Sequence, residues 1–244
     1  KWQFYQTDNF NTYYSQNGEP LAKSVAQLAE IELPEMETFM EYGLQRRTNI
    51  VVYNSFNDFQ QTNIGLKTDV AVNGGNTQLV NNKMVIYYNS DHLHLRKQVR
   101  QGIARVLLDN ILFGDDLGEF AANQALLDLP KWLTDGFVSY AAENWSTELD
   151  DQLKSAMLSG KYRNFYQFAY EQPNLAGHAF WRYIEEVYKK ENTKYFLYLA
   201  RLYRNLNGAS NRIAKMKFKA LLGSPRLRTT LPRPSRIGSG RPSR

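Results

Sequence analysis

The sequence has no cysteine among its 244 residues, and its only histidines are His92, His94 and His178. Thiolate zinc sites, iron–sulfur clusters and cysteine nucleophiles are therefore excluded, because each depends on a cysteine thiolate. Few imidazoles are available as metal ligands. No apolar run approaches the roughly 20 residues that a helix needs to cross a bilayer, so we predict no membrane span.

Acidic residues are absent from the last part of the chain. Residues 223–244 contain six arginines and no acid, so residues 1–222 carry 24 basic and 24 acidic residues. This last segment is rich in proline, serine and glycine and cannot bury enough apolar surface to offset the entropy lost on ordering. We predict a disordered basic tail over 223–244 and interpret it as vector-derived. Such a tail can attract phosphate groups, but we infer no nucleic-acid partner from it.

The first part of the sequence has the composition of β-strands. Residues 3–14 alternate well enough for a strand or hairpin, and the apolar, β-branched or aromatic runs at 48–53 and 84–88 predict two more strands. The sequence Asn-Gly-Gly-Asn at 73–76 predicts a turn.

Helical periodicity begins at 20–42, where Pro34 predicts a break or kink. Asn54 and Ser55 are suited to cap a short helix at 56–61. From about residue 93 the chain is predicted to be almost wholly helical, with helices near 95–114, 132–143, 149–158, 175–190, 193–203 and 210–222. Strands followed by helices predict an α+β fold, in which a small mixed sheet in the N-terminal half packs with a mainly helical C-terminal half. We predict one domain over 1–222.

Two neighbouring segments of the helical part carry a recognisable pattern. The pattern of the second segment, 129–140, is carried by Pro130, Trp132, Asp135, Gly136 and Tyr140. It resembles P-x-W-x-x-E-G-x-A-E-Y of the gluzincin (peptidase MA-like) metallopeptidases, in which the glutamate binds zinc. The resemblance implies a zincin-like fold, of the kind found N-terminal to TolB-like β-propellers in bacterial envelope proteins. It also implies an extracytoplasmic location, in the periplasm or cell envelope.

The first segment, 95–114, aligns with the helix that carries H-E-x-x-H in that family. Alignment through Leu112-Phe113-Gly114 places the motif at Gln101-Gly102-Ile103-Ala104-Arg105. Glutamine is a poor zinc ligand, arginine keeps its positive charge in proteins, and glycine has no side chain to act on a zinc-bound water. We therefore predict no catalytic residue, no metal and no cofactor.

The apolar residues of this helix recur every four positions, so we expect them to face the core. They are Leu95, Val99, Ile103, Leu107 and Ile111. Gly102 inside the helix costs about 1 kcal/mol relative to alanine. A neighbour packed into the space of the missing glutamate would explain the glycine, and a chance loss is the alternative.

The resemblance places Asp135 at the glutamate ligand and Ser139 at a second glutamate that supports the site. Because positions 105 and 135 would both contact one ion in the family, their side chains should converge. We predict an Arg105–Asp135 salt bridge where zinc would stand, and the alternative is that both side chains are solvated in an open groove. The vestigial cleft would consist of Gln101, Gly102, Arg105, Asp135 and Ser139.

The histidines offer a different metal site. His92 and His94 directly precede the first helix, and Asp91 or Asp135 would complete a rearranged set of ligands. Two histidines that are two residues apart share a face only in a strand, so we favour a capped helix start with surface histidines.

A later segment resembles Y-x-x-G-x-x-F of the family, in which the tyrosine assists the transition state. Asn174 occupies the place of that tyrosine, so this role is absent too. The segment also contains His178, and its Gly177, Phe180 and Trp181 are expected to serve helix packing.

The function that these residues favour is binding without catalysis. The sequence predicts an inactive metallopeptidase-like domain with a protein or peptide partner, because the groove of a peptidase is shaped to hold an extended chain. One alternative is an active hydrolase with a rearranged metal site. The other is a carbohydrate- or peptidoglycan-binding module that uses some of the 33 aromatic side chains. The oligomeric state stays open.

Overall fold

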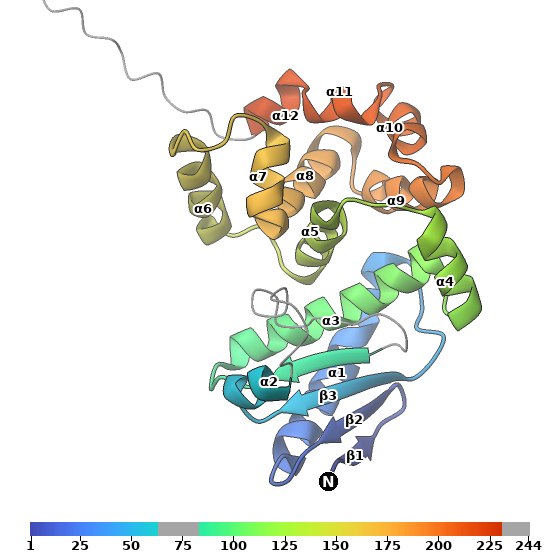
Figure 1. Ribbon diagram of the computed structural model, residues 1–244, viewed down its shortest axis with the longest axis vertical. Coiled ribbons are helices and arrows are strands. Elements are labelled where there is room, and N and C mark those ends of the chain that lie inside the picture. The colour runs from blue at the N-terminus through green and yellow to red at the C-terminus, as the bar shows by residue number, and fades with distance from the viewer. Residues whose placement is uncertain (63–82, 231–244) are drawn as a thin grey trace, which may run out of the picture. The chain divides into compact units, whose positions relative to one another are not determined.

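The computed structural model describes residues 1–62 and 83–230, and the turn predicted at 73–76 lies outside them. The strands lie in the first part of the chain with two helices between them, and only helices follow the last strand (Figure 1), which confirms the α+β class. The chain divides into two compact units, and each is described by itself. Unit 1 comprises Lys1–Leu129, Ala141–Asn144 and Leu197–Asn205, and unit 2 comprises Pro130–Tyr140, Trp145–Phe196 and the described residues from Leu206 onward. The single domain over 1–222 stays a prediction.

Unit 1 contains a four-stranded mixed sheet. Its strands are β1 (Gln3–Gln6), β2 (Phe10–Tyr14), β3 (Thr48–Tyr53) and β4 (Lys83–Tyr87). They lie in the order β1-β2-β3-β4; β1 is antiparallel to β2, and β2, β3 and β4 are parallel. The mixed sheet predicted from the sequence is confirmed.

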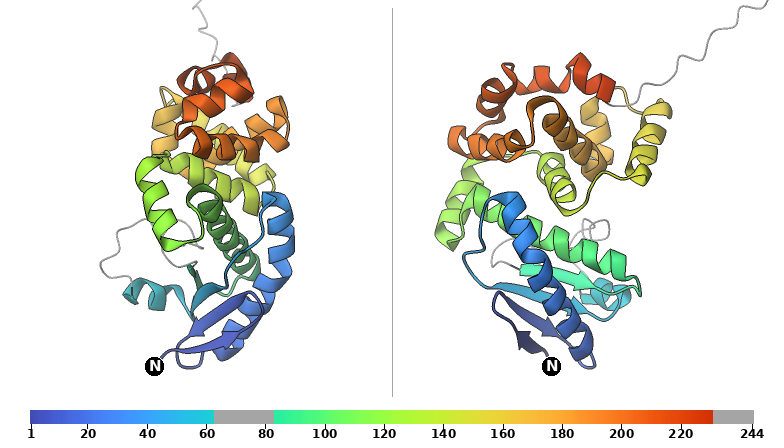
Figure 2. Two further views of the ribbon diagram at one scale, coloured as in Figure 1. Left: turned by 90° about the vertical axis from the view of Figure 1, so that its right-hand side faces the viewer. Right: turned by 180° about the vertical axis from the view of Figure 1, so that it is seen from behind.

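Unit 1 also contains the helices α1 (Glu19–Met40), α2 (Phe56–Thr62), α3 (His92–Phe113) and α4 (Leu117–Leu126), and α4 packs on α3. α1 packs on β2 and α3 packs on β4, and the two helices contact each other. Figure 2 shows them on the same side of the sheet. Alternate strand residues, among them Phe10, Ile50, Val52, Met84 and Ile86, are buried on that face. α2 lies against Tyr53 and Tyr87 on the opposite face.

Helix α1 runs through Pro34 to Met40, so the proline does not end the helix. Pro34 is exposed, and only its own missing N–H is lost from the helical ladder. Leu33, Met36 and Met40 are buried on the inner side, and their packing holds the helix together on both sides of the proline.

The later helices are α5 (Lys131–Ala142), α6 (Thr147–Leu158), α7 (Phe165–Glu171), α8 (Pro173–Tyr188), α9 (Glu191–Tyr203), α10 (Leu206–Ala214), α11 (Phe218–Leu222) and α12 (Pro225–Thr230). The described helices include none that is long and apolar enough to span a membrane.

The C-terminal helices differ from the sequence prediction in two ways. The helix predicted at 210–222 is divided into α10 and α11, because Lys215 has a left-handed backbone with φ 57° and Asn207 Oδ1 accepts a hydrogen bond of 3.0 Å from the N–H of Phe218. Helix α12 lies within the segment predicted to be disordered. Leu227 is buried there, and its N–H donates to Ser224 Oγ at 3.2 Å. Residues 231–244 lie outside the described part of the chain.

A buried carboxylate joins α1 to α3. Glu32 accepts hydrogen bonds from Arg96 and from Arg100, and Arg100 Nε also donates to the carbonyl of Ala142 at 2.7 Å. Burial alone would raise the pKa of Glu32, but the hydrogen bonds from the two guanidinium groups outweigh it, and the pKa lies below its ordinary value of 4.5.

Replacing Glu32 by glutamine should lower the free energy of unfolding by about 3 kcal/mol at neutral pH, because two guanidinium groups lose their carboxylate. Folding lowers the pKa of Glu32, so its stabilising contribution is complete above 4.5 and is lost as the pH falls through the folded-state pKa. Urea unfolding of the two proteins should therefore differ at neutral pH and converge in acid. Glu35, which is exposed and bonds to Arg100 alone, is the control; E35Q should cost less than about 1 kcal/mol. Equal losses for E32Q and E35Q would contradict the prediction.

Candidate functional site

Helix α3 carries the first half of the candidate site in unit 1. Four residues separate the end of β4 from the start of this helix. Gln101 and Arg105 are both half-buried, and Gly102 is buried. Because Gln101 and Arg105 are four residues apart, they lie on the same side of the helix, as the resemblance requires. Of the expected spine, Leu95, Val99, Ile103 and Leu107 are buried, whereas Ile111 is half-buried.

Gly102 is in close contact with strand β4. A Cβ atom at this position would lie 2.5 Å from Cε and 3.2 Å from Cγ of Met84, which is itself fully buried. A neighbour, Met84, therefore does pack against Gly102, as one of the two explanations of this glycine expects. A side chain as long as glutamate has no room here unless Met84 moves.

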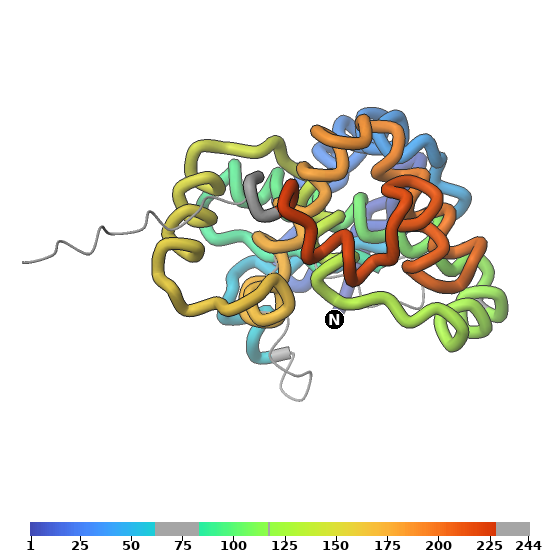
Figure 3. Tube along the Cα trace, turned by 90° about the horizontal axis from the view of Figure 1, so that it is seen from above, coloured from blue at the N-terminus to red at the C-terminus, as the bar shows by residue number. Residues whose placement is uncertain are grey.

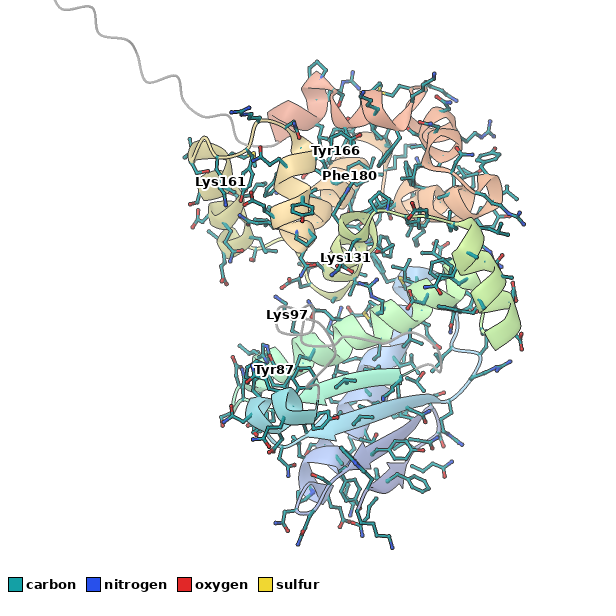
Figure 4. All side chains as sticks on the ribbon, in the orientation of Figure 1. Tyr87, Lys97, Lys131, Lys161, Tyr166 and Phe180 are labelled. Atoms are coloured by element: carbon teal, nitrogen blue, oxygen red, sulfur yellow. The ribbon has the colours of Figure 1, made fainter. Side chains whose placement is uncertain are left out.

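Helix α5 carries the second half of the candidate site in unit 2. Asp135 and Ser139 are 7% and 6% exposed. Pro130 immediately precedes the helix, a position that costs no hydrogen bond. Trp132 packs edge to face against Phe165 and Phe180. The aromatic side chains therefore hold α5 in the core of unit 2, where Figure 4 shows Phe180 on α8.

Gly136 explains why α5 and α8 can approach each other so closely. A Cβ at Gly136 would lie 2.1 Å from Cα of Gly177, and a Cβ at Gly177 would lie 2.0 Å from the carbonyl oxygen of Trp132. The indole N–H of Trp181 donates to the carbonyl of Leu133 at 2.8 Å. Gly177 and Trp181 therefore serve helix packing, as the sequence predicts.

Ser139 contacts a histidine to which the sequence analysis assigns no role. Its Oγ lies 3.0 Å from Nδ1 of His178, and His178 is 1% exposed. The rings of Tyr140 and Trp145 pack edge to face on the imidazole, at centroid distances of 5.9 and 5.1 Å. Ser139 thus has a polar partner inside unit 2.

Tyr140 has a charged partner that the sequence reasoning missed. Its hydroxyl donates to the carboxylate of Glu185 on α8. Burial, together with this hydrogen bond and the negative charge of Glu185, raises the pKa of Tyr140 far above its ordinary value, so the hydroxyl stays protonated as a donor. The two residues are 45 positions apart, and no local pattern in the sequence links them.

Asp91 caps α3, because its Oδ1 accepts hydrogen bonds from the N–H groups of Leu93 and His94, at 2.9 and 3.1 Å. The prediction of a capped helix start is therefore confirmed. His92 Nε2 lies 3.3 Å from the hydroxyl of Tyr88. Among residues 1–62 and 83–230, no three side chains of histidine, aspartate or glutamate are grouped as metal ligands.

His94 connects this cap to the edge of the sheet through Gln98. Its Nδ1 lies 2.9 Å from Nε2 of Gln98, and the Gln98 amide bonds both the N–H and the carbonyl of Tyr87, at 3.2 and 2.8 Å. Burial lowers the pKa of His94, so the imidazole is neutral at neutral pH. Figure 4 shows Tyr87 near the start of α3.

The structure thus brings Gln101, Gly102 and Arg105 together on α3, and Asp135 and Ser139 together on α5. The two helical segments belong to different units, so the Arg105–Asp135 salt bridge stays a prediction. Asn174, at the place of the family's tyrosine, lies in the first turn of α8 and is half-buried.

Comparisons with known proteins bring no assignment. No family model matches the chain, and no curated protein matches it.

Replacing Gly136 by alanine should lower the free energy of unfolding by about 3 kcal/mol or more, because the new methyl group would overlap the backbone of α8. In an exposed helix without this contact, the same change would stabilise by about 1 kcal/mol. Gly223 is the matched control, since a Cβ there would meet its nearest atom at 3.6 Å; G223A should stay within about 0.5 kcal/mol of the parent. Denaturant unfolding measures both changes, and a mild effect of G136A would contradict the close approach.

Placing a glutamate at position 102, where H-E-x-x-H has one, should destabilise the protein for a steric reason. The variant G102E should unfold at a lower denaturant concentration than the parent, by about 3 kcal/mol or more, since a buried position would gain both volume and charge. Adding M84A should recover part of that loss, although M84A alone destabilises by about 2–5 kcal/mol. A double-mutant cycle checks this, and strict additivity of the two changes would show that Met84 is not the obstacle.

Proposed function

We propose that this chain is a catalytically inactive metallopeptidase-like domain with a zincin-like fold, and that it binds a polypeptide. The observation that carries the proposal is the contact between Gly102 and Met84. The position where the resemblance expects a catalytic base has no functional group, and the space beside it is filled by a buried side chain.

The chemistry of the neighbouring positions supports the same conclusion. Gln101 and Arg105 stand where two histidine ligands would stand, on the same side of α3. A guanidinium keeps its positive charge at any physiological pH, so a divalent cation beside Arg105 would be repelled. Ser139 replaces a carboxylate and is hydrogen-bonded to His178. Zinc binding and proton transfer would therefore both be lost.

Residues other than the metal ligands keep the pattern of the second helix. Pro130 starts α5, Trp132 anchors it, and Gly136 permits its close packing on α8. These residues support the shape of the scaffold rather than catalysis. A scaffold that keeps its packing after losing its ligands retains the means to hold an extended chain, in which main-chain hydrogen bonds supply affinity and side-chain pockets supply selectivity.

The proposed partner is a protein or peptide of the cell envelope, and the envelope location derives from the family resemblance. The Arg105–Asp135 salt bridge stays a prediction from the sequence.

The proposal predicts peptide binding without cleavage. Purified full-length protein, screened against a display library of unstructured peptides, should select binders and leave them intact with or without zinc. The variant R105E should weaken the affinity of the protein for the selected peptides by at least about tenfold, or 1.4 kcal/mol. Arg163, which is exposed on unit 2, supplies the control R163E, which should bind as the parent does.

Two results would contradict the proposal. Cleavage of peptides that stops on addition of EDTA would show an active metallopeptidase with a rearranged site. Selection of glycans instead of peptides on an array would favour the carbohydrate-binding alternative.

The Arg105–Asp135 salt bridge predicted from the sequence has a test of its own. The variants R105A and D135A and their double mutant should show a coupling energy above about 1 kcal/mol in unfolding experiments, whereas a solvated pair would give less.

A further inference from the structure

The charges of this chain are strongly segregated along the sequence. Residues 1–188 carry 15 basic and 23 acidic residues. Residues 189–230 carry eleven basic residues and a single acid, Glu191. The equal totals of basic and acidic residues in 1–222 conceal this division. The basic excess is therefore not confined to the last residues of the chain, but extends into the described helices.

The part of unit 2 that runs from α10 to α12 carries much of this charge, on the helices and on the residues between α10 and α11. α10, α11 and α12 follow one another along one edge of the unit (Figures 1 and 3). Their apolar side chains point into the core of unit 2, since Ala209, Phe218, Leu221 and Leu227 are buried. The basic side chains on the outside are exposed: Arg212, Lys215, Lys217, Lys219 and Arg226. We call these five residues the basic surface.

Four of these five residues lack, among the described residues, the carboxylate partners that balance charge elsewhere in unit 2. Lys154 pairs with Asp150, and Lys161 pairs with Glu171. In the described part of the chain, Arg212, Lys215, Lys217 and Lys219 form no ion pair, and Lys215 Nζ donates to the carbonyl of Arg212 at 3.2 Å. Four cations within eight residues of sequence produce a positive field that attracts an anionic partner.

Two observations favour a lipid surface over a nucleic acid. Ile213 and Met216 lie between the cations and are only half-buried, and apolar side chains among lysines gain from contact with the acyl boundary of a bilayer. The only aromatic residue in 206–230 is Phe218, which is buried. Single-stranded nucleic acids require exposed rings on which bases stack, and the basic surface offers none.

We propose that the basic surface binds the headgroups of an anionic phospholipid bilayer. This binding would attach the unit to a membrane surface without any segment of it spanning the bilayer. The lysine and arginine side chains would contact lipid phosphates, and Ile213 and Met216 would contact the boundary between headgroups and acyl chains. The inference is independent of the proposed peptide binding, because it uses different residues.

Sedimentation of the full chain with lipid vesicles tests this inference. The protein should bind vesicles that contain phosphatidylglycerol, should bind pure phosphatidylcholine vesicles far more weakly, and should be released by salt. Each lysine near an anionic surface contributes about fivefold to affinity. A triple change should therefore weaken binding on the order of 100-fold, namely K215Q, K217Q and K219Q.

Two further variants make the test specific. The matched control removes three exposed lysines elsewhere, K23Q, K83Q and K154Q, and should bind as the parent does. A further variant changes the four arginines of residues 231–244 to glutamine and should keep most of the affinity of the parent. Its substitutions are R233Q, R236Q, R241Q and R244Q. Thermal unfolding of each variant verifies that it is folded.

The inference would be overturned by equal losses in the triple variant and its control, by complete loss in the variant of the last segment, or by equal binding to neutral vesicles. It would also be overturned if the protein bound single-stranded or duplex DNA and no anionic vesicle. Loss confined to the triple variant on anionic vesicles supports it.

Discussion

Helix α3 lies so close to strand β4 that a Cβ atom at position 102 would overlap Met84 unless the methionine side chain moved. Met84 fills the space beside Gly102, and the same packing buries Val99, Ile103 and Leu107 on the inner side of the helix. The stability of unit 1 and the composition of its candidate site are therefore linked. A sequence change that placed a glutamate at position 102 would have to displace this core methionine.

A second close approach holds unit 2 together. Gly136 and Gly177 let α5 and α8 meet backbone to backbone, and Trp132 and Trp181 fill the space around that contact with aromatic rings. Two polar contacts lie within the unit beside this packing, Ser139–His178 and Tyr140–Glu185. The side chains that resemble remnants of an active site thus also contribute to an ordinary, well-packed core.

Much of the fold follows from local sequence. The run at 48–53 coincides with β3, because alternate residues in it are β-branched and fit a half-buried sheet. Pro34 does not break α1, because tertiary packing on both sides of the exposed proline outweighs one lost hydrogen bond, and the kink stays a prediction. Helix α4 was missed although Asp116 caps it through the N–H groups of Gly118 and Glu119, and α7 was missed although Asn164 caps it. Both caps are readable from sequence, whereas Glu185 as the partner of Tyr140 is not, because only the fold brings the two residues together.

The amide of Gln98 has a consequence for strand β4. The N–H of Tyr88 points toward β3, where it bonds the carbonyl of Tyr53, so the N–H and carbonyl of Tyr87 point the other way and are both taken by Gln98. The Gln98 side chain, from helix α3, therefore makes the two backbone hydrogen bonds that a neighbouring strand would make. A polypeptide that paired with this edge of β4 would find the N–H and carbonyl of Tyr87 already hydrogen-bonded. The amide therefore ends the strand's pairing edge at Tyr87 and protects this residue from pairing with another chain.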